Sequence, residues 1–586
     1  MQMTTMNTKN RLLYIPLALV CLFFTSCQDM FSPESDNDYG IERTLTNPIT
    51  SLGFLTTAYS LIPTTYDFSE CATDDAVIND PTSAYLPMVN GAWNALSDPT
   101  GIWSSSYKAI VNVNKFLIYA PTMKISWSSS VDDSLYRKRW IAEAYGVRAY
   151  HHFMLLRYYG GVGTSGNVLG VPYLKQLVDI DQNVWGNIER PTYKSTVDSI
   201  VKDLNYAIAN LPSEYIGIDR VFGIKNKNRL TSWICLAIKA ELYMHAASPK
   251  YNGGSYDPAY CDSALKYSSI MIEHIGKDNG GGLASLSSVL KPKIFYTTND
   301  NENNAEIIWR MNQASEATTA YNMSLTIEAK NYPPSLSGKG QVNPTQDFVD
   351  AFTGLNGYPI TDSRSLYDPT KPYLNRDLRL DTCVIRDGGK LSPTSTIIIK
   401  TSKDDSKNGI ENQGGTRTGY YLKKMLRPDF SITNPVAGKK TIRPLIRYTE
   451  MFLIFAEAGT AAHGADWKGN YAYTPRDVIK AIRKRAGITN RDAYATNLVA
   501  TDFMGLVRNE RRIELAFEGF RFWDLRRWGL ETNVILHKAR ILVSGGAPQF
   551  LSIDDEIRNF TTFKYFAPIP NSEILKCPKL EQNGTN

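Results

Sequence analysis

Histidine is scarce in this sequence, with six among 586 residues. None of the six occurs in H-E-x-x-H or in another spacing typical of a metal site. His151 and His152 are neighbours in an expected helix, so their side chains point to different faces and cannot share a metal. No G-x-S-x-G segment is present, which removes the nucleophile elbow of many serine hydrolases. The sequence therefore predicts no metal, no cofactor and no common catalytic constellation.

Excess charge of either sign is also small. The chain has 64 Lys and Arg against 58 Asp and Glu, a net charge of +6, and an expected N-terminal leader carries Lys9 and Arg11 away. Over this length, that balance is too weak to indicate a nucleic-acid partner. The shares of hydrophobic residues (43%) and charged residues (21%) are typical of a globular protein. Tyr (34) and Trp (10) together are twice as many as Phe (22), which suits stacking on polar ligands and also Tyr-rich helix packing.

Long apolar runs are missing beyond the N-terminus. A basic segment precedes the run LLYIPLALVCLFF (12–24), which is too short to span a membrane comfortably and has the layout of a signal peptide. The run leads into FTSC, which resembles the lipobox of bacterial lipoproteins. We therefore expect residues 1–26 to be a lipoprotein signal peptide and Cys27 to be acylated. Residues 27–44 are expected to form a flexible acidic tether between the acylated cysteine and the body, and their early acids resemble signals for export to the cell surface.

No C-x-x-C pair occurs in the chain. The five cysteines that follow Cys27 are odd in number and widely spaced, so the sequence assigns no disulfide. Cys235 and Cys261 fall in expected helices, which predicts that they are buried thiols.

Residues 45–586 are predicted to form a single, mainly α-helical body. Residues 45–290 show apolar positions at helical spacing, in segments that suggest tetratricopeptide-like hairpins and an α-α superhelix. Residues 291–440 are richer in Gly, Pro, Asn, Ser and Thr, with strand-like pieces at EIIWRM and STIIIK. This texture indicates a loop-rich insertion with short strands. A helical pattern returns in residues 441–586, with PLIRYTEMFLIFAEA as its first segment.

Two segments resemble functional motifs but lack the sequence context that those motifs need. Residues 161–166 fit G-x-G-x-x-G, yet a helix precedes them, whereas a dinucleotide site needs a strand before and a helix after. Asp74 and Asp75 suggest a glycosidase pair, but adjacent side chains do not flank a sugar bond across the required ~5–9 Å. The sequence leaves open a distant carboxylate that completes such a pair.

The segment RRIELAFEGFRFWDLRRWG (511–529) concentrates arginines and acids. At helical spacing, Glu510, Glu514 and Glu518 form one stripe between an apolar stripe and an arginine stripe. Like charges four residues apart repel on a free helix, so these glutamates need arginine partners nearby. Carboxylates between the arginines and the core do not suit a phosphate-binding patch. The pattern predicts a structural ion-pair lattice at a helix junction, with a helix that ends at Gly519.

The same segment resembles the C-terminal signature of the SusD/RagB family of nutrient-binding outer-membrane lipoproteins. Further segments match the family, in the family's order, along nearly the whole mature chain: Trp103-x3-Tyr107-x2-Ile110-x3-Asn114, AEAYGVRAYHHFMLLRYYGGV (142–162), RPTYKSTVDSIVKDLNYAI (190–208), NRDLRL (375–380), IRYTEMFLIFAEA (446–458), and PIPNSEI (568–574) with Gln582-Asn583. Leu378, where proline is common, and the ending Gly584-Thr585 depart from the family pattern.

The resemblance implies helical hairpins that lie against a SusC-like TonB-dependent transporter, and a ligand site on irregular loops elsewhere. It implies non-catalytic capture of an extracellular glycan, an oligo- or polysaccharide, and its delivery to that transporter. Capture of peptides on the same scaffold is the alternative. A surface glycan hydrolase is a third hypothesis, which the missing catalytic constellations disfavour.

The family's binding loops correspond to residues 66–103 and 312–345 of this chain. An aromatic ring stacks on the apolar face of a sugar, while the sugar hydroxyls need carboxylate or amide partners. The glycan-binding residues expected in these loops are Asp74, Tyr85, Trp93, Asn94, Tyr321 and Tyr332. Trp103, at helical spacing, and Trp309, in a strand-like piece, are expected in the core instead.

Overall fold

The structure is a computed structural model. It describes residues 48–64, 66, 68–124, 130–177, 184–275, 296–297, 306–312, 327–392, 394–410, 412–429, 431–433, 440–488, 492–530, 534–544, 547–559 and 565–584. The predicted signal peptide, Cys27, the tether up to residue 44 and Tyr321 lie outside the described residues.

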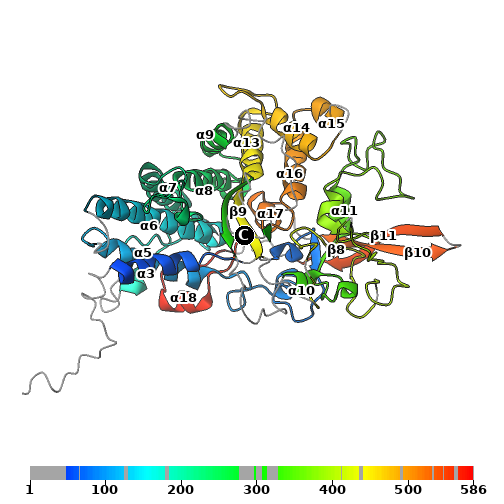
Figure 1. The fold of residues 1–586 in the computed structure, drawn as a ribbon, viewed down its shortest axis with the longest axis horizontal. Helices are drawn as coiled ribbons and strands as arrows, with labels where there is room; N and C mark the ends of the chain where they lie inside the picture. Colours follow the sequence, from blue (N-terminus) through cyan, green and yellow to red (C-terminus); the bar gives the residue numbers. More distant parts are fainter. Residues whose placement is uncertain are drawn as a thin grey trace, which may run out of the picture.

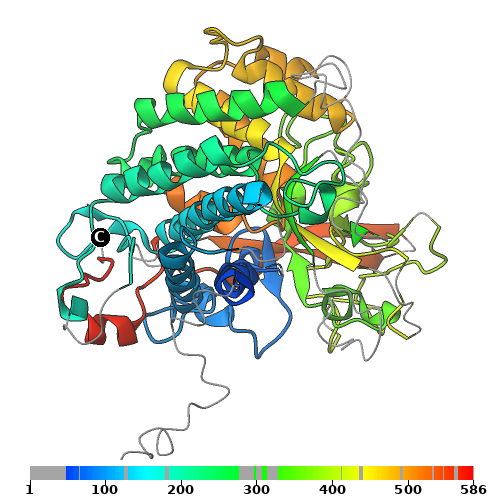
Figure 2. The same ribbon diagram turned by 60° about the vertical axis from the view of Figure 1, so that its left-hand side comes forward.

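The long helices follow one another as a superhelix (Figures 1 and 2). Each packs against the next in the series α3 (Pro48–Ser60), α5 (Trp103–Tyr119), α6 (Ser130–Tyr159), α7 (Tyr193–Asn210), α8 (Ser232–Ala246), α9 (Pro258–Ile275), α13 (Tyr448–His463) and α14 (Pro475–Arg485), and α16 (Phe503–Glu514) packs on the last two. Between α9 and α13 the chain leaves the superhelix, forms the loop-rich part and returns. The predicted mainly α-helical superhelix is confirmed.

Capping side chains and apolar spacing explain where these helices lie. The hydroxyl of Thr192 accepts a hydrogen bond from the Ser195 N–H at 3.1 Å and begins α7. Thr474 and Asp477 form a capping box around Pro475 at the start of α14. The buried face of α7 repeats at helical spacing, with Val197, Ile200, Leu204 and Ala207.

Short helices and paired strands make up the rest of the described chain. The short helices are α4 (Leu86–Val89), α10 (Ile327–Asn331), α11 (Gln346–Ala351), α12 (Leu380–Cys383), α15 (Ala493–Asn497), α17 (Arg521–Arg527) and α18 (Asn571–Lys576), with 3-10 turns η1 (Ser69–Ala72), η2 (Val184–Asn187), η3 (Ile224–Asn226), η4 (Pro249–Tyr251) and η9 (Pro334–Leu336). The strand pairs, all antiparallel, are β1 (Ala76–Ile78) with β6 (Val342–Pro344), β2 (Gly161–Val162) with β3 (Val168–Leu169), β7 (Val384–Ile385) with β8 (Tyr421–Leu422), β10 (Ile535–Ser544) with β11 (Ala547–Ile557), and β9 (Lys440–Arg447) between β4 (Tyr296–Thr297) and β5 (Ile307–Asn312).

The expected strand at EIIWRM is confirmed as β5, whereas one helix start and the other strand are wrong. Residues 444–447 of the expected helix PLIRYTEMFLIFAEA belong to β9, because their backbone pairs with β5, and α13 begins only at Tyr448. STIIIK is not a strand: Ile399 alone makes an isolated bridge, to Gly389. The β10–β11 hairpin was not expected from the sequence; it projects at the end of the molecule opposite α6 and α7 (Figure 1).

The helix of the arginine-rich segment is shorter than predicted. α16 ends at Glu514 rather than at Gly519. Phe517 has a φ of 62° and Gly519 a φ of 88°, so the chain turns through the left-handed region twice before α17. This turn moves Glu518 off the helix stripe that the sequence predicted.

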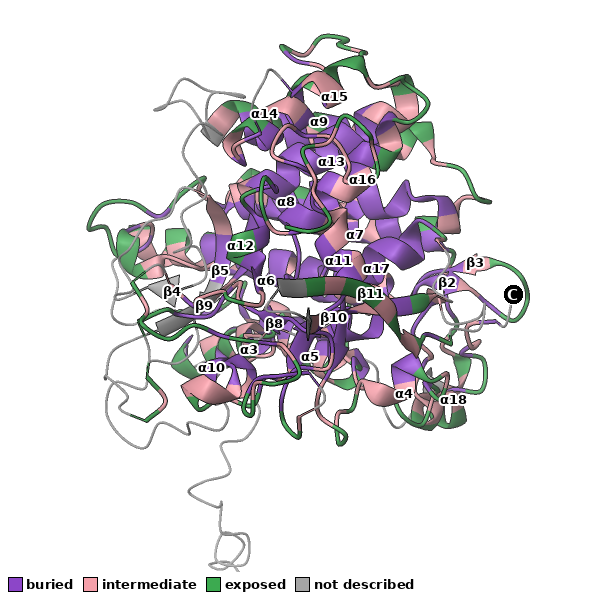
Figure 3. Ribbon diagram, turned by 90° about the vertical axis from the view of Figure 1, so that its right-hand side faces the viewer, coloured by how far each residue is buried: buried purple, intermediate pink, exposed green. Residues whose placement is uncertain are grey.

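Buried side chains form two hydrophobic cores. The first fills the superhelix and includes Trp103 and Trp309, 6% and 1% exposed, which confirms the prediction for both. The second joins residues of the loop-rich part to Ile513 of α16 and to Ala516 and Phe517 after it. Figure 3 shows the helices α8, α13 and α16 largely buried, while β11 carries many exposed residues. Within the described residues, no helix is both long and apolar enough to cross a bilayer.

The five cysteines that follow Cys27 are buried free thiols: Cys71, Cys235, Cys261, Cys383 and Cys577. The prediction for Cys235 and Cys261 is confirmed. Burial raises the pKa of the Cys71 and Cys235 thiols well above the ordinary value, which keeps both thiols protonated and unreactive.

Candidate functional site

Strand pairing brings the two expected binding loops together. β1 lies in the loop of residues 66–103 and β6 in the loop of residues 312–345, and they pair with Ala76 opposite Pro344 and Ile78 opposite Val342. The backbone contact continues past the strands, because the Asn79 N–H donates to the Gln341 carbonyl at 2.6 Å. Two segments that are more than 250 positions apart in the sequence therefore share one face of the loop-rich part.

Asp80 and Gln341 lie where the two loops meet. The Gln341 amide donates to Asp80 Oδ2 at 2.9 Å, and both residues are half-buried. Asp80 Oδ1 accepts from the hydroxyl of Thr82 at 2.7 Å and from its N–H at 2.9 Å. These hydrogen bonds lower the pKa of Asp80, so the carboxylate stays ionised. Sequence analysis missed this pair because no pattern in either loop indicates that they touch.

Asp74 is held by arginines of the signature segment. Arg521 Nη2 lies 2.7 Å from Asp74 Oδ2, and Arg512 Nη2 lies 3.0 Å from the same oxygen. Arg512 Nε also contacts Asp75 Oδ1 at 2.6 Å. Although burial raises the pKa of Asp74, the two guanidiniums hold it well below its usual range. Both carboxylates of the suspected glycosidase pair are therefore engaged in ion pairs.

Trp93 and Tyr332 are buried, at 2% exposure each. The Trp93 ring packs edge-on against Phe522 at 5.8 Å between centroids, and its Nε1 donates to Asp98 Oδ1 at 3.1 Å. The Tyr332 hydroxyl donates to the Arg427 carbonyl. Neither ring presents a free face for stacking on a sugar in this structure. Their part in ligand binding stays a prediction, and the geometry favours support over contact.

Tyr85 and Asn94 reach the surface of the first loop. Tyr85 is half-buried at the start of α4, and Asn94 is exposed. The Asn94 side chain donates to the Ala92 carbonyl at 2.8 Å and accepts from the Leu96 N–H at 2.8 Å, which fixes its turn. Asn94 is thus exposed, while Tyr85 and Asp74 are half-buried and Trp93 and Tyr332 are buried.

The three glutamates of the signature form the predicted ion-pair lattice. Glu510 contacts Arg483 Nη1 at 2.6 Å and Arg379 Nη2 at 2.9 Å. Glu514 binds Arg379 at 3.0 Å, Arg447 at 3.3 Å and also Arg485. Glu518 pairs with Arg447 at 2.8 Å and Lys424 at 2.7 Å. The lattice prediction is confirmed, with the arginines supplied by other segments of the chain.

Other motif residues are cross-connected in the same way. Arg148 of α6 holds Asp203 of α7 with two hydrogen bonds, at 2.7 and 2.9 Å, and Asn114 of α5 at 2.9 Å. Arg190 donates to the Asn583 side chain at 2.9 Å and so fastens the C-terminal segment. Most of the polar residues in the quoted motifs are thus buried and hydrogen-bond one segment of the chain to another. Their pattern therefore indicates the fold and not the ligand.

The G-x-G-x-x-G segment is the β2–β3 hairpin rather than a nucleotide loop. Glu581 Oε1 accepts from the Ser165 N–H at 2.5 Å and lies 2.3 Å from the position that a Cβ on Gly163 would take. A carboxylate on the loop repels phosphate. The glycine at 163 therefore makes room for the C-terminal segment.

These elements define a helical-repeat protein with a polar loop face beside its superhelix. Residues 305–585 match the sequence model of the SusD family, and residues 31–243 match a second model described as starch-binding and associating with the outer membrane. The chain belongs to the SusD/RagB family. A SusD-like protein of Formosa agariphila is 23% identical over 438 residues, which are 74% of this chain and 71% of that protein.

Solved structures share the fold. A SusD-like protein from Bacteroides fragilis aligns with a TM-score of 0.70 at 22% identity, over 92% of this chain and 97% of that one. A SusD-like carbohydrate-binding protein from the same species gives 0.65 at 21% identity, over 92% and 99%. A laminarin-binding SusD-like protein gives 0.58 at 18% identity, over 92% and 99%.

Proposed function

We propose that this protein captures an oligo- or polysaccharide at the cell surface and delivers it to a SusC-like TonB-dependent transporter in the outer membrane. The observation that carries the proposal is the β1–β6 pairing, which joins the two loops that the family resemblance implies as the ligand site. Family membership and a carbohydrate-binding relative with the same fold support the ligand class.

The contact residues that we propose are Tyr85, Asn94, Asp80 and Gln341. The half-buried Tyr85 contributes an aromatic ring, and the other three offer carboxylate and amide groups to sugar hydroxyls. Trp93, Asp74 and Tyr332 support the face from beneath, since each is tied to a neighbour in the interior. Tyr321 remains an expected contact outside the described residues.

The repeat helices supply the surface that we assign to the transporter. A groove of about 420 Å³ lies between α5, α6 and α7, with Lys175 and Lys202 on its wall. Ile118 on this groove is 50% exposed. Tyr206 of α7 is 40% exposed and its ring lies 4.4 Å from that of Tyr145. Acylation of Cys27 would keep this surface at the membrane.

A glycan array with the purified protein tests the ligand class. Wild type is expected to bind at least one glycan, and the double variant Asp80→Ala/Gln341→Ala to bind it at least tenfold more weakly. Asp368→Ala is the matched control, because Asp368 makes the same turn with Thr370 at 2.9 and 2.7 Å, outside both loops. Equal binding by the double variant and the control would refute the site.

Assays on the same purified protein distinguish the alternative functions. Binding to peptides but to no glycan would favour peptide capture. Release of sugar product from a polysaccharide panel would favour a hydrolase and overturn the non-catalytic proposal.

A further inference from the structure

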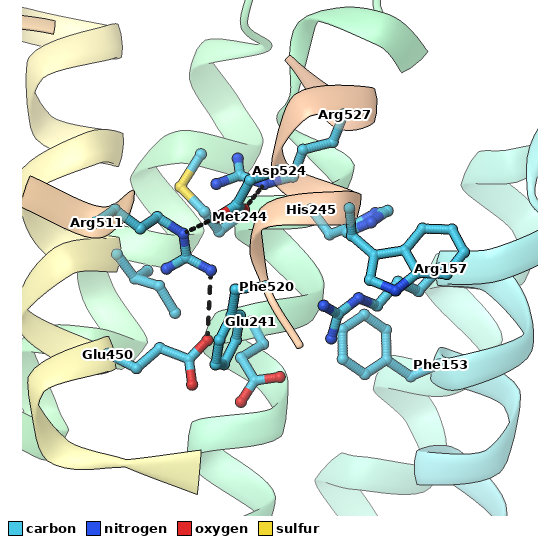
Figure 4. A pocket seen from close by; sticks show the side chains of 12 residues that line it. Phe153, Arg157, Glu241, Met244, His245, Glu450, Arg511, Phe520, Asp524 and Arg527 are labelled. Atoms are coloured by element: carbon cyan, nitrogen blue, oxygen red, sulfur yellow. Dashed lines mark hydrogen bonds and ion pairs between the residues drawn. The ribbon is translucent and has the colours of Figure 1, made fainter. Parts of the chain in front are cut away.

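A small internal cavity lies at the junction between the superhelix and the signature segment. Its volume is about 30 Å³. α6, α8, α13 and α16 line it together with α17 and the turn before it (Figure 4). The side chains with charged or titratable groups on its wall are Arg157, Glu241, His245, Glu450, Arg511, Asp524 and Arg527. The cavity is therefore buried and lined largely by charged or titratable side chains.

Most of the charges on the wall are balanced. Asp524 accepts from Arg511 Nε at 2.7 Å and from Arg527 Nε at 2.8 Å. Arg527 also holds Glu457, whose pKa is lowered: burial raises it, but the Arg527 guanidinium more than offsets that effect. The dashed lines of Figure 4 join Arg511 to Asp524 and to Glu450. Arg511 is shared between Asp524 and Glu450, with Glu450 at the longer distance of 3.7 Å, and Glu241 adds a second carboxyl beside Glu450.

Four polar atoms of the lining residues have no protein hydrogen-bond partner within the described chain. They are Glu241 Oε1, His245 Nε2, Glu450 Oε2 and Arg511 Nη1, and each is shielded from solvent. An unsatisfied buried polar group costs roughly 1–3 kcal/mol, so four of them around one cavity call for a shared partner. A water needs about 10–15 Å³ and two to four polar partners, which this cavity provides.

The two glutamates lie against each other. In Figure 4 their carboxyl groups point into the same region, on the side of the cavity where Arg511 approaches. Burial, and then the neighbouring carboxyl of Glu450, raise the pKa of Glu241 well above its ordinary value. Burial also raises the pKa of Glu450 to about 7, although Arg511 and Arg157 lower it. Two neighbouring carboxyls in a buried site cannot both ionise without a large cost in free energy.

We propose that this cavity binds one ordered water and one proton shared by Glu241 and Glu450, and that the water joins both carboxyls to His245 and Arg511. His245 serves as a neutral partner, because burial and the nearby Arg157 hold its pKa well below the ordinary value. The site connects α8 and α13 of the superhelix to α16 and α17. Loss of the proton leaves a second buried carboxylate at this junction and weakens it.

Infrared spectroscopy of the full-length wild type tests the proton directly. At pH 6 the carbonyl-stretch band of a protonated carboxyl is expected, with a shift in D2O, and part of its intensity should be lost by pH 8.5. The double variant Glu241→Gln/Glu450→Gln should remove the band, because burial keeps the pKa of the remaining carboxyl raised in either single variant. Glu457→Gln is the matched control, since Glu457 lies on α13 two turns from Glu450 but is ionised by Arg527. Absence of the band in wild type at pH 6 would overturn the proposal, whichever variants fold.

Two further measurements test the water and the linkage. Crystallographic density for one water within hydrogen-bond distance of Glu241 and Arg511 is expected, and an empty cavity would refute it. On unfolding at pH 6, wild type should release about one proton more than the double variant Glu241→Gln/Glu450→Gln, measured by calorimetry in two buffers. Equal proton release would contradict the shared-proton site, while leaving the glycan proposal untouched.

Discussion

Arg447 Nε lies 2.8 Å from Glu518 Oε2, and the pair joins the start of α13 to the turn after α16 across 71 positions of the sequence. Both side chains are nearly inaccessible, at 2% and 3%. Arg447 also donates to the Glu514 carbonyl at 2.8 Å. The superhelix and the signature segment therefore meet through charges, and the fold depends on their mutual neutralisation.

Burial makes this lattice costly to break. In water an ion pair contributes little, but removal of one partner from a buried pair leaves an uncompensated charge. Arg379 shows the extent of the coupling, since it binds Asp377 of its own segment together with Glu510 and Glu514. Loss of one acid affects several arginines from different segments at once.

Glu514→Gln should lower the free energy of unfolding by about 3–5 kcal/mol. The substitution leaves Arg379, Arg447 and Arg485 with one negative charge fewer inside the protein. The control is Asp198→Asn, which breaks an exposed pair with Lys194 at 2.9 Å and should cost about 0.5 kcal/mol. Denaturant unfolding of both variants measures the difference, and similar midpoints would show that the lattice is not stabilising.

Acid should unfold the protein through the same carboxylates. Although burial opposes the shift, Arg511 and Arg527 lower the pKa of Asp524 to about 2, and arginines also lower the pKa of Glu514 and Glu518. A carboxylate whose pKa is lower in the folded than in the unfolded state stabilises the fold at pH values above its unfolded pKa. This stabilisation is lost as the pH falls through its folded pKa. Melting temperature should therefore drop between pH 4 and pH 2, with proton uptake on unfolding. A flat profile in this range would contradict the assignment.

Periodicity and motif spacing were enough to predict the superhelix and the lattice. α5, α6, α7 and α8 carry apolar side chains at helical spacing, and a stripe of three glutamates beside arginines needs partners wherever the helix packs. The partners themselves, such as Arg379 and Arg483, were beyond reach, because the sequence does not say which distant segments come together.

The burial of the loop aromatic residues could also not be predicted from the sequence. Trp93 sits in a Gly- and Asn-rich loop, which is typical of a surface ring, yet Phe522 and Asp98 enclose it. Tyr332 is enclosed by Arg427 in the same way. The contact between Asp80 and Gln341 could not be predicted, because it depends on the register of β1 and β6. Each of these strands has three residues, which is too short a pattern to indicate the pairing from the sequence.

Trp93→Ala should reduce stability by about 3–5 kcal/mol, since it empties a buried site and leaves Asp98 without the indole donor. Tyr85→Ala, at a half-buried position, should cost less and should weaken glycan binding at least fivefold. Unfolding midpoints and titration with the best glycan from the array give both quantities. If Trp93→Ala keeps its stability but loses binding, the ring contacts the ligand directly and the supporting role assigned to it is wrong.

Close packing of α6 against its neighbours should appear in a glycine comparison. A Cβ on Gly146 would lie 2.7 Å from Leu230 Cδ1 and 3.3 Å from Cys235 Sγ, so Gly146→Ala must displace the buried Leu230 side chain and should cost about 1–3 kcal/mol. Gly53 lies within α3 with nothing inside 4 Å of its added Cβ. Gly53→Ala should therefore raise stability by about 0.5–1 kcal/mol, because alanine is the better helix former. Thermal and denaturant unfolding measure both signs. A stabilising Gly146→Ala would mean that the superhelix packs more loosely at this contact than the structure has it.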